Sequence, residues 1–362
     1  MNELVWIAAA ALVIGWVVFV VLPYWPKPVE DVSASISVTG PPPSLRGPSL
    51  KVMSWNIQFA AGNANNNFRI TGGRDPWPER ETVTACLAEV AEVIARCSPD
   101  VILLQEVDLG ARRTHQIDQL RHLRSLLGEE YTSSAYCHYW KNAFCPHPFV
   151  MGNTSMGLVT LSKHPITRAT RHSLKNLASQ GLMRRVFGIK RAVLSCTLQV
   201  GDAPVVVMNT HLEAFPHRYH APTMAHQRDT LIRLMDEQGP ESLTLVGGDF
   251  NLLPCPEHYE HLLEQDRAYY HPGHTEMTQL YERYSGAPAL SDLLSDSHRD
   301  SFTHTCLFHT PKVADKTVDY IFSNRKGSVL GYEVLHDGTI HISDHFPLVA
   351  DIALDQGRAS GR

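Results

Sequence analysis

The chain has 362 residues, of which 43% are hydrophobic, and it carries a formal net charge of −5. This length and apolar content suffice for one large domain with a buried core, or for two small domains. The charge excludes a strongly basic surface but not a nucleic-acid substrate, because a bound cation can supply positive charge locally.

An uncharged apolar run begins the chain. Residues 5–22 read VWIAAAALVIGWVVFVVL, close to the ~20 residues that cross a hydrocarbon core, and Trp6 and Trp25 lie near its ends. No basic residue precedes the run and no small-residue cleavage site follows it, which argues against a cleaved signal peptide. We expect residues 1–25 to be a single-pass transmembrane anchor with the lipid bilayer as partner. Lys27 is the only nearby basic residue, so the side of the membrane that holds the domain stays open.

The anchor is followed by a segment of different composition. Residues 26–50 are rich in Pro, Ser, Val and Gly and are expected to form an extended linker. The globular catalytic domain is expected at residues 51–354, with a polar tail at 355–362. The seven Cys residues fit no complete disulfide framework, and whether Cys137 and Cys145 are bridged stays open.

Helical and strand patterns alternate along the domain and predict a mixed α/β fold. The helices are expected at residues 78–97, 115–127 and 224–236. The strands are expected at residues 52–57, 101–104, 157–161, 192–198, 205–209, 243–246, 318–321 and 346–352. Residues 131–154 are aromatic and show no clear period, so we expect a loop over the functional site.

Polar side chains follow several of these strands at the point where each one ends. Asn56 ends the first strand and Glu106 follows the apolar run 101–104. Alone, either residue is more often a turn or rim residue than a ligand. Together they offer the amide and carboxylate oxygens that Mg²⁺ prefers. Asp249 and Asn251 follow two glycines after another strand and project to the same side if the chain is still extended; alone, they would be read as an Asx turn.

Two histidines also end strand-like segments. His211 ends one, and Asp344-His345 places a metal-capable carboxylate beside an imidazole that can contact phosphate. Asp319 lies within a buried strand and needs a partner there. His345 could be that partner, in which case the carboxylate would orient the ring and stabilise its protonated form, as in a Ser-His-Asp triad. The sequence has no P-loop and no Gly-x-Ser-x-Gly motif.

Six segments occur in a diagnostic order: SWNIQ, LLQEVD, NTHLE, GGDFN, VDYIF and SDHFPL. This set resembles the endonuclease/exonuclease/phosphatase (DNase I-like) superfamily over residues 51–354. The resemblance implies a four-layer α/β sandwich of two mixed sheets flanked by helices. It also implies phosphoester hydrolysis with Mg²⁺, or with Mn²⁺ or another divalent cation.

The resemblance further implies roles for individual residues. Metal binding falls to Glu106, Asn56 and Asp344, and catalysis to His211, Asp249, Asn251, Asp319 and His345. Asn251 also matches the phosphate-binding Asn of the family. Arg112-Arg113 and Lys190-Arg191 are candidate phosphate contacts, although solvated surface charge is an equally good interpretation. Arg191 is preferred over Arg112, because family members often place a basic residue on that strand. Whether His345 or Asp249 is the general base stays open.

The substrate is not fixed by these motifs. With the expected anchor, we favour a membrane-anchored phosphodiesterase that hydrolyses a lipid or glycolipid headgroup by in-line attack of an activated water. A membrane-tethered endonuclease or exonuclease is the alternative. A catalytically silent binding domain is a second alternative, and the complete acidic and His set argues against it. No obligate protein partner is inferred.

Overall fold

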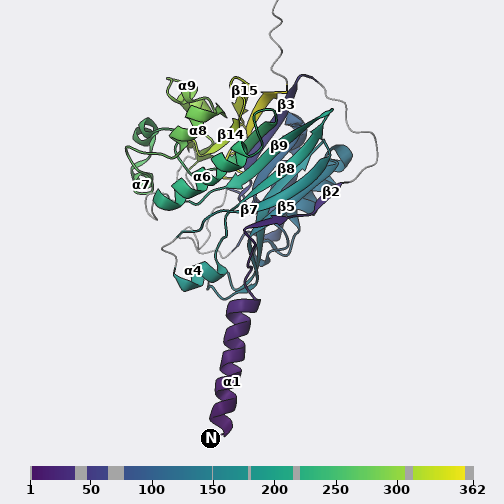
Figure 1. Ribbon diagram of the computed structural model, residues 1–362, viewed down its shortest axis with the longest axis vertical. Helices are drawn as coiled ribbons and strands as arrows, with labels where there is room; N and C mark the ends of the chain where they lie inside the picture. Colours follow the sequence, from purple (N-terminus) through teal and green to yellow (C-terminus); the bar gives the residue numbers. More distant parts are fainter. Residues whose placement is uncertain are drawn as a thin grey trace, which may run out of the picture.

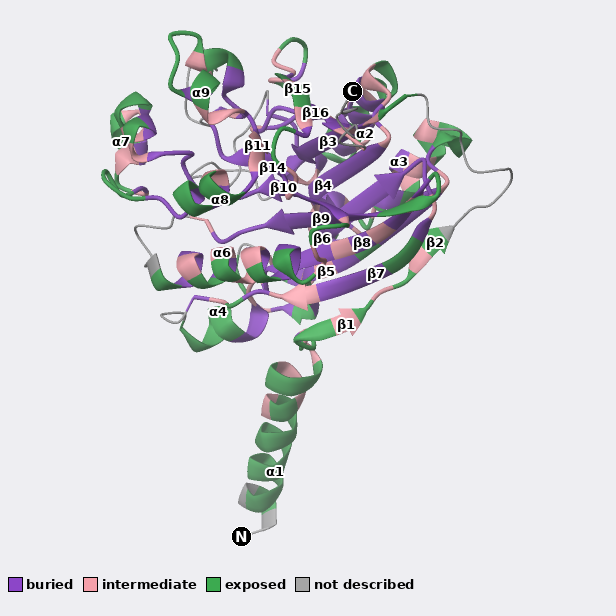
Figure 2. Cartoon of the chain, turned by 45° about the horizontal axis from the view of Figure 1, so that its top comes forward, coloured by how far each residue is buried: buried purple, intermediate pink, exposed green. Residues whose placement is uncertain are grey.

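A computed structural model describes residues 2–36, 47–63, 77–148, 150–177, 181–214, 221–305 and 313–354. The centre of the molecule is formed by two seven-stranded mixed sheets packed face to face (Figures 1 and 2). The first sheet has, in spatial order, β1 (Val29–Asp31), β7 (Ile166–Ser173), β8 (Ala192–Val200), β9 (Ala203–His211), β10 (Leu243–Asp249), β14 (Asp319–Ser323) and β11 (Ser285–Ala287). The second has β15 (Val329–Val334), β16 (Leu348–Ala353), β3 (Ser49–Asn56), β4 (Val101–Asp108), β6 (Gly152–Ser162), β5 (Ser133–Cys145) and β2 (Ala34–Ile36). A short ribbon joins β12 (His304–Thr305) to β13 (Ala314–Lys316).

Helices cover the outer faces of both sheets, except that α1 extends away from the domain (Figures 1 and 2). The longer ones are α1 (Asn2–Trp16), α2 (Arg80–Cys97), α3 (Gln119–Leu127), α4 (Leu182–Phe187), α6 (Ala221–Asp236) and α8 (Met277–Arg283). The short ones are α7 (Glu264–Arg267), α9 (Leu290–Leu293) and the 3₁₀ turns η2 (Gln58–Ala60), η4 (Arg112–Thr114), η5 (Gly128–Glu130), η6 (Pro256–His261) and η7 (His298–Ser301). The alternating strand and helix patterns therefore produce the expected α/β sandwich.

Three apolar clusters hold the layers together. The central cluster lies between the sheets and includes Val52, Leu103, Leu194 and Leu245. A second packs α2 and α3 against the outer face of β3 and β4, and a third packs α6 and α8 against β9, β10 and β14. Inward and outward residues alternate along each strand, so one strand can serve two clusters.

The predicted transmembrane helix is not found: among the described residues, no helix is long and apolar enough to cross a membrane. The helix α1 has 15 residues and is followed directly by a five-residue π-helical segment, η1 (Val17–Val21). Large apolar side chains on α1 are exposed, including Trp6 at 75% and Leu12 at 74%, and the helix extends away from the domain (Figures 1 and 2).

The aromatic segment expected to be a loop is a strand instead. Residues 133–145 form β5, which pairs with β6 along its length and shifts register between His138 and Trp140 and again between Asn142 and Cys145. These shifts break the period-two pattern that marks a strand in a sequence. Cys137 and Cys145 are free thiols. They lie eight residues apart on one strand, about 26 Å when extended, which is too far for a disulfide.

Part of the expected linker also joins the sheets. The strand β1 pairs with β7 at one edge of the first sheet, and β2 pairs with β5 at one edge of the second. The segment between α1 and the domain therefore contacts both layers.

Candidate active site

Three neighbouring strands bring three of the predicted side chains together. Asp249 ends β10, and it is the register partner of His211 on parallel β9 and of Asp319 on antiparallel β14. Gly248 lets these strands approach. Its φ is +148°, and an added Cβ would lie 1.9 Å from the carbonyl oxygen of Thr210. Any other residue there would push β10 away from β9.

Asp249 is the centre of this group. Its Oδ2 lies 3.2 Å from Nε2 of His211 and 3.6 Å from Nε2 of His345, and it accepts a 3.0 Å hydrogen bond from Nδ2 of Asn56. Its Oδ1 accepts a 2.9 Å bond from the backbone N–H of Asn251. Burial raises the pKa of Asp249 to about 6, although the positive His345 and the Asn56 amide act in the opposite direction. The carboxyl is thus poised to exchange a proton near neutral pH.

His345 is paired with Asp319. Nδ1 of His345 lies 2.8 Å from Oδ2 of Asp319, and both groups are buried. Burial alone would lower the pKa of His345, but Asp319 and then Asp249 raise it well above its usual range. The Trp55 indole donates a 2.8 Å bond to the carbonyl oxygen of His345 and holds its backbone in place. The site therefore contains a fixed imidazolium.

His211 is in a different electrostatic environment. Its Nδ1 lies 3.4 Å from the hydroxyl of Tyr139, a neutral partner. Burial lowers the pKa of His211 well below its usual range, and the charges of Arg191 and His345 lower it further. His211 is therefore neutral at physiological pH.

Arg191 supplies a buried cation. It lies just before β8, it is 4% exposed, and Nε and Nη1 of its guanidinium have no hydrogen-bond partner within the described part of the chain. The guanidinium lies 5.7 Å from the ring centroid of Tyr139. Its charge lowers the pKa values of Glu106, Asp249 and His211, so it is directed at the site. Unpaired donors of a buried guanidinium are costly unless an anion binds them.

The second sheet brings an acidic group to the same place. Asn56 ends β3, and its Nδ2 also lies 3.5 Å from Oε1 of Glu106. Glu106 sits at a register shift in β4, with a φ of +56°, so its side chain leaves the regular alternation of the strand. Ser343 donates a 2.7 Å bond to the carbonyl oxygen of Asn56, which ties the loop that carries Asp344 to β3.

Two of these carboxyls share one environment. Burial raises the pKa values of Glu106 and Asp344, and the charge of Glu106 raises that of Asp344 further. These two half-buried carboxyls offer the oxygen ligands that Mg²⁺ takes, whereas Oδ1 of Asn56 accepts a 3.0 Å bond from the backbone N–H of Gln58 and its Nδ2 faces Glu106. Asp249, Asp319 and His345 form another candidate group for a divalent ion, with one ligand atom of each within 4.8 Å of the others.

The structure therefore assembles nearly all of the predicted site residues. The exception is Arg112, which is exposed and stacks over the ring of Trp77 at 4.9 Å. Its neighbour Arg113 is the cation that acts on the site: it forms a 2.8 Å ion pair with Asp108 and is the leading charge that lowers the pKa of Glu106.

Sequence reasoning missed two residues that position the group. Tyr139 is neutral and contacts both sheets. Its hydroxyl accepts a 3.1 Å bond from the Glu106 backbone N–H in the second sheet and lies 3.4 Å from Nδ1 of His211 in the first. Thr303 accepts 3.0 Å bonds at Oγ1 from the backbone N–H groups of Val318 and Asp319. Tyr139 lies in the aromatic segment that did attract attention, but no pattern distinguishes Thr303 from other threonines.

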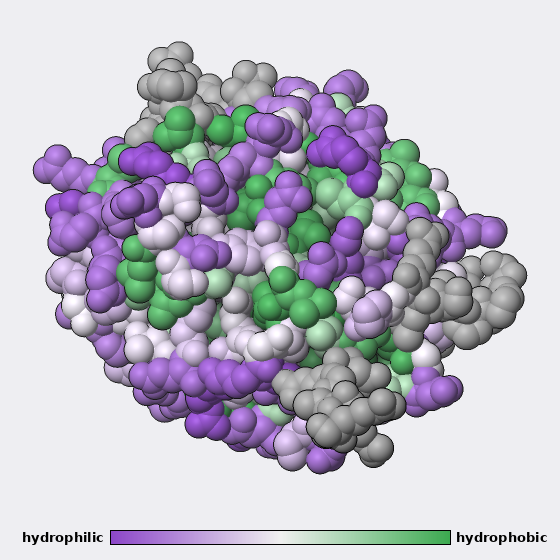
Figure 3. Space-filling view, turned by 90° about the horizontal axis from the view of Figure 1, so that it is seen from above, coloured by the Kyte–Doolittle hydropathy of each residue, from purple (hydrophilic) through white to green (hydrophobic). Residues whose placement is uncertain are grey.

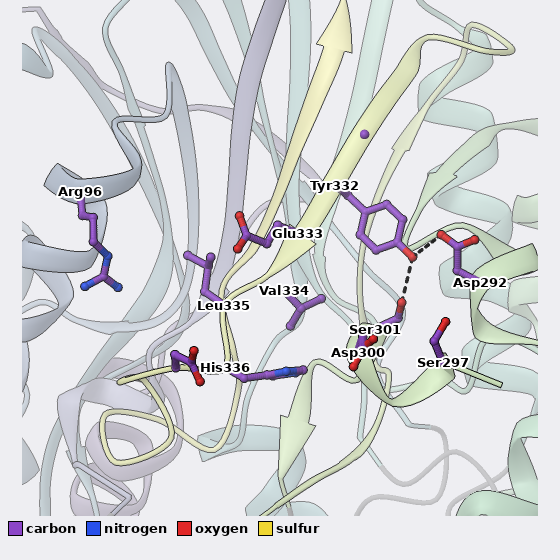
Figure 4. A pocket seen from close by; sticks show the side chains of 12 residues that line it. Arg96, Asp292, Ser297, Asp300, Ser301, Tyr332, Glu333, Val334, Leu335 and His336 are labelled. Atoms are coloured by element: carbon purple, nitrogen blue, oxygen red, sulfur yellow. Dashed lines mark hydrogen bonds between the residues drawn. The ribbon is translucent and has the colours of Figure 1, made fainter. Parts of the chain in front are cut away.

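A separate cavity of about 840 Å³ lies between β15, α9 and η7 (Figure 4). Within it the hydroxyl of Tyr332 donates a 2.6 Å bond to Asp292, and Ser301 lies 2.8 Å from the same hydroxyl. None of the predicted catalytic or metal-binding residues lines this cavity. The candidate active site is therefore the group of side chains at the strand ends, which we call the strand-end cluster: Asn56, Glu106, Arg191, His211, Asp249, Asn251, Asp319, Asp344 and His345.

The comparisons with known proteins agree with this geometry. Residues 53–345 match the model of the Endonuclease/Exonuclease/phosphatase family. Similar solved structures include an endonuclease/exonuclease/phosphatase from Beutenbergia cavernae DSM 12333, with a TM-score of 0.56 and 20% identity over 84% of this chain and 71% of that one. The human Nocturnin catalytic domain with bound sulfate has a TM-score of 0.51 and 20% identity over 85% and 94%.

A functionally unknown conserved protein from Enterococcus faecalis V583 has a TM-score of 0.53 and 15% identity over 84% and 99%. At these identities the likeness shows the fold alone. The comparison with curated proteins gave no match. The family match covers most of the chain and every segment of the strand-end cluster, so the protein belongs to the endonuclease/exonuclease/phosphatase (DNase I-like) family.

Proposed function

We propose that this protein is a divalent-metal-dependent phosphodiesterase that uses an activated water for in-line attack on phosphorus. The observation that carries the proposal is that a proton acceptor, Asp249, and a proton donor, His345, lie 3.6 Å apart in one buried site. Asp249 has a pKa of about 6, and His345 is held in its cationic form by Asp319. Members of this family are metal-dependent phosphoesterases.

The charge states favour one division of roles between the candidate base and acid. Ionised Asp249 accepts the proton of the attacking water, because His345 already carries its proton at neutral pH. His345 then donates its proton to the leaving oxygen, and Asp319 keeps the ring oriented and stabilises its charge.

Two further groups fit the phosphate. The unpaired Nε and Nη1 of Arg191 can bind its equatorial oxygens, where negative charge builds up in the transition state. Asn251 lies beside Asp249 through its backbone bond, and its side chain is the phosphate-binding amide that the family resemblance implies. Neutral His211 adds a polar contact without adding charge.

The residues that would hold the ion are Glu106, Asn56 and Asp344. Their oxygens suit Mg²⁺ or Mn²⁺, and a bound ion supplies Lewis-acid stabilisation of the phosphoryl charge. The fit rests on two half-buried carboxyls whose pKa values are raised by loss of solvation, an arrangement that a cation would relieve.

Hydrolysis of bis-p-nitrophenyl phosphate by the purified full chain tests the proposal. We expect turnover with Mg²⁺ that EDTA abolishes and that Glu106→Ala and His345→Ala each reduce by at least about 10²-fold. The exposed histidine variant His226→Ala is the matched control and should turn over normally. Absence of metal-dependent turnover on any phosphoester would reject the enzyme and favour the catalytically silent domain.

The substrate class is a second step of the proposal. A lipid or glycolipid headgroup is favoured by the exposed apolar side chains of α1, which suit contact with a lipid surface. The face of the molecule opposite α1 mixes hydrophilic and hydrophobic side chains (Figure 3). Plasmid DNA and sphingomyelin liposomes should be assayed side by side. Cleavage of DNA without hydrolysis of sphingomyelin would reject the lipid substrate and favour the nuclease.

A further inference from the structure

A second imidazole–carboxylate pair lies directly beside His345 and has no role in the proposed reaction. His304 and His345 are partners in an isolated antiparallel β-bridge, so their side chains leave the backbone on the same side. The backbone N–H of Thr305 donates 2.8 Å to the carbonyl of Asp344, and that of Phe346 donates 2.7 Å to the carbonyl of Thr303. The two rings meet edge to face, with centroids 4.8 Å apart and an interplanar angle of 89°.

His304 is oriented by a buried chain of charges. Its Nδ1 lies 3.1 Å from Oδ1 of Asp315, and the other oxygen of Asp315 lies 3.2 Å from Nζ of Lys316. Lys316 is in turn 2.8 Å from Asp266. Because a carboxylate only accepts, Nδ1 of His304 carries the proton, and its Nε2 is left with a lone pair. A carboxylate on one ring nitrogen is the usual support of an imidazole whose other nitrogen binds a metal.

The ligand atoms already lie close together. One ring nitrogen of His304, one carboxylate oxygen of Asp344 and one ring nitrogen of His345 are all within 4.8 Å of one another. Zinc takes such ligands at about 2.0–2.2 Å, which small side-chain rotations can provide. The donor set differs from the carboxyl oxygens of Glu106 and Asp344, which suit Mg²⁺.

We propose that His304, Asp344 and His345 form a second cation site, selective for zinc or a similar nitrogen-seeking transition metal, that switches the enzyme off. An ion there takes Asp344 from the oxygen site and occupies a nitrogen of His345. The ion and the catalytic proton then exclude each other on that ring. Inhibition rests on the proposed phosphodiesterase function, whereas zinc binding itself does not.

Zinc retention by the full chain tests the site directly. Metal-free protein is dialysed against micromolar ZnCl₂ in a large excess of Mg²⁺, which keeps the oxygen ligands occupied, and bound zinc is counted by atomic emission. We expect the wild type to retain zinc, and His304→Ala to lower the affinity by at least about tenfold. His226→Ala, which removes an exposed histidine of α6, should bind zinc as the wild type does. Equal retention by the wild type and His304→Ala, or no retention by either, would overturn the site.

A second variant and two further measurements test the site and its inhibitory role independently. His304→Gln keeps a polar side chain and replaces His304→Ala if that variant does not fold, and Co²⁺ absorption of the wild type should show nitrogen coordination that either variant loses. Zinc should inhibit Mg²⁺-supported hydrolysis, and either His304 variant should raise the inhibitory concentration by at least about tenfold. Turnover that zinc leaves unchanged overturns the inhibitory role alone. A protein that retains zinc but hydrolyses nothing refutes the proposed function and not the site.

Discussion

Two histidines contact the same oxygen of Asp249, yet their pKa values move in opposite directions. His211 and His345 lie 3.2 and 3.6 Å from that oxygen, and both are buried. On the His345 side the second ring nitrogen faces Asp319, which raises its pKa. On the His211 side it faces the neutral Tyr139 hydroxyl, so burial lowers the pKa of His211 and the charge of Arg191 lowers it further. The shared carboxylate also raises the pKa of His345, but the two rings differ in the group on their second nitrogen, which is charged for His345 and neutral for His211.

Removing Asp319 should make the His345 side resemble the His211 side. In Asp319→Asn we expect the pKa of His345 to fall to or below about 6.5 and kcat to fall by about 10²–10⁴-fold. Histidine NMR signals followed through a pH titration report the first effect, and the His211 signal serves as the internal control. If His345 stays cationic in the variant, Asp319 is not the source of its charge.

Replacing Arg191 removes the buried positive charge next to His211. We expect Arg191→Gln to reduce kcat/KM by about 10²-fold, because the phosphate loses its buried donors. It should also raise the pKa of His211, which Arg191 now lowers. Arg112→Gln is the matched control, and steady-state kinetics should show a change of no more than about twofold. Equal losses in both variants would remove the distinction between the two arginines.

The carboxyl of Asp249, which both histidines contact, should set the acid limb of the pH profile of kcat/KM. Because the pKa of Asp249 is raised to about 6, its carboxyl is neutral below that pH and accepts a proton only above it. The pKa of His345 is raised as well, so that ring keeps its proton throughout this range. We expect kcat/KM to fall by about tenfold per pH unit below pH 6. A limb that begins only near pH 4, the usual range of an aspartate, would show that Asp249 is not perturbed.

The smallest effect should come from Tyr139→Phe, which removes the neutral partner of His211. The variant loses a 3.4 Å contact with the ring and a 3.1 Å bond from the Glu106 backbone. We expect a loss of about 1 kcal/mol in the free energy of unfolding, measured in urea, and a decrease of only a few-fold in kcat/KM. A loss as large as that of Arg191→Gln would give Tyr139 a direct role in the reaction.

How far the sequence predicts this site depends on the kind of residue. The residues of the strand endings were predicted because each follows a buried apolar run, and the resemblance to the family ordered their roles. Tyr139 was hidden because β5 contains two register shifts that break its alternation. The choice between Arg112 and Arg113 depended on the direction of a 3₁₀ turn, which neighbouring identical residues cannot reveal. No helix among the described residues is long and apolar enough to cross a membrane, because the apolar run is divided into α1 and a π-helical segment, and hydropathy does not report where a helix ends.

The two short strands that precede the domain also decide how this protein can be shortened. Without β1 and β2, the strands β7 and β5 would become the open edges of their sheets, with unpaired backbone groups that can recruit another chain. A chain cut back to Lys51 would keep every residue of the cluster but lose this protection. Solubility and resistance to intermolecular sheet formation therefore depend on a segment whose composition resembles a simple spacer.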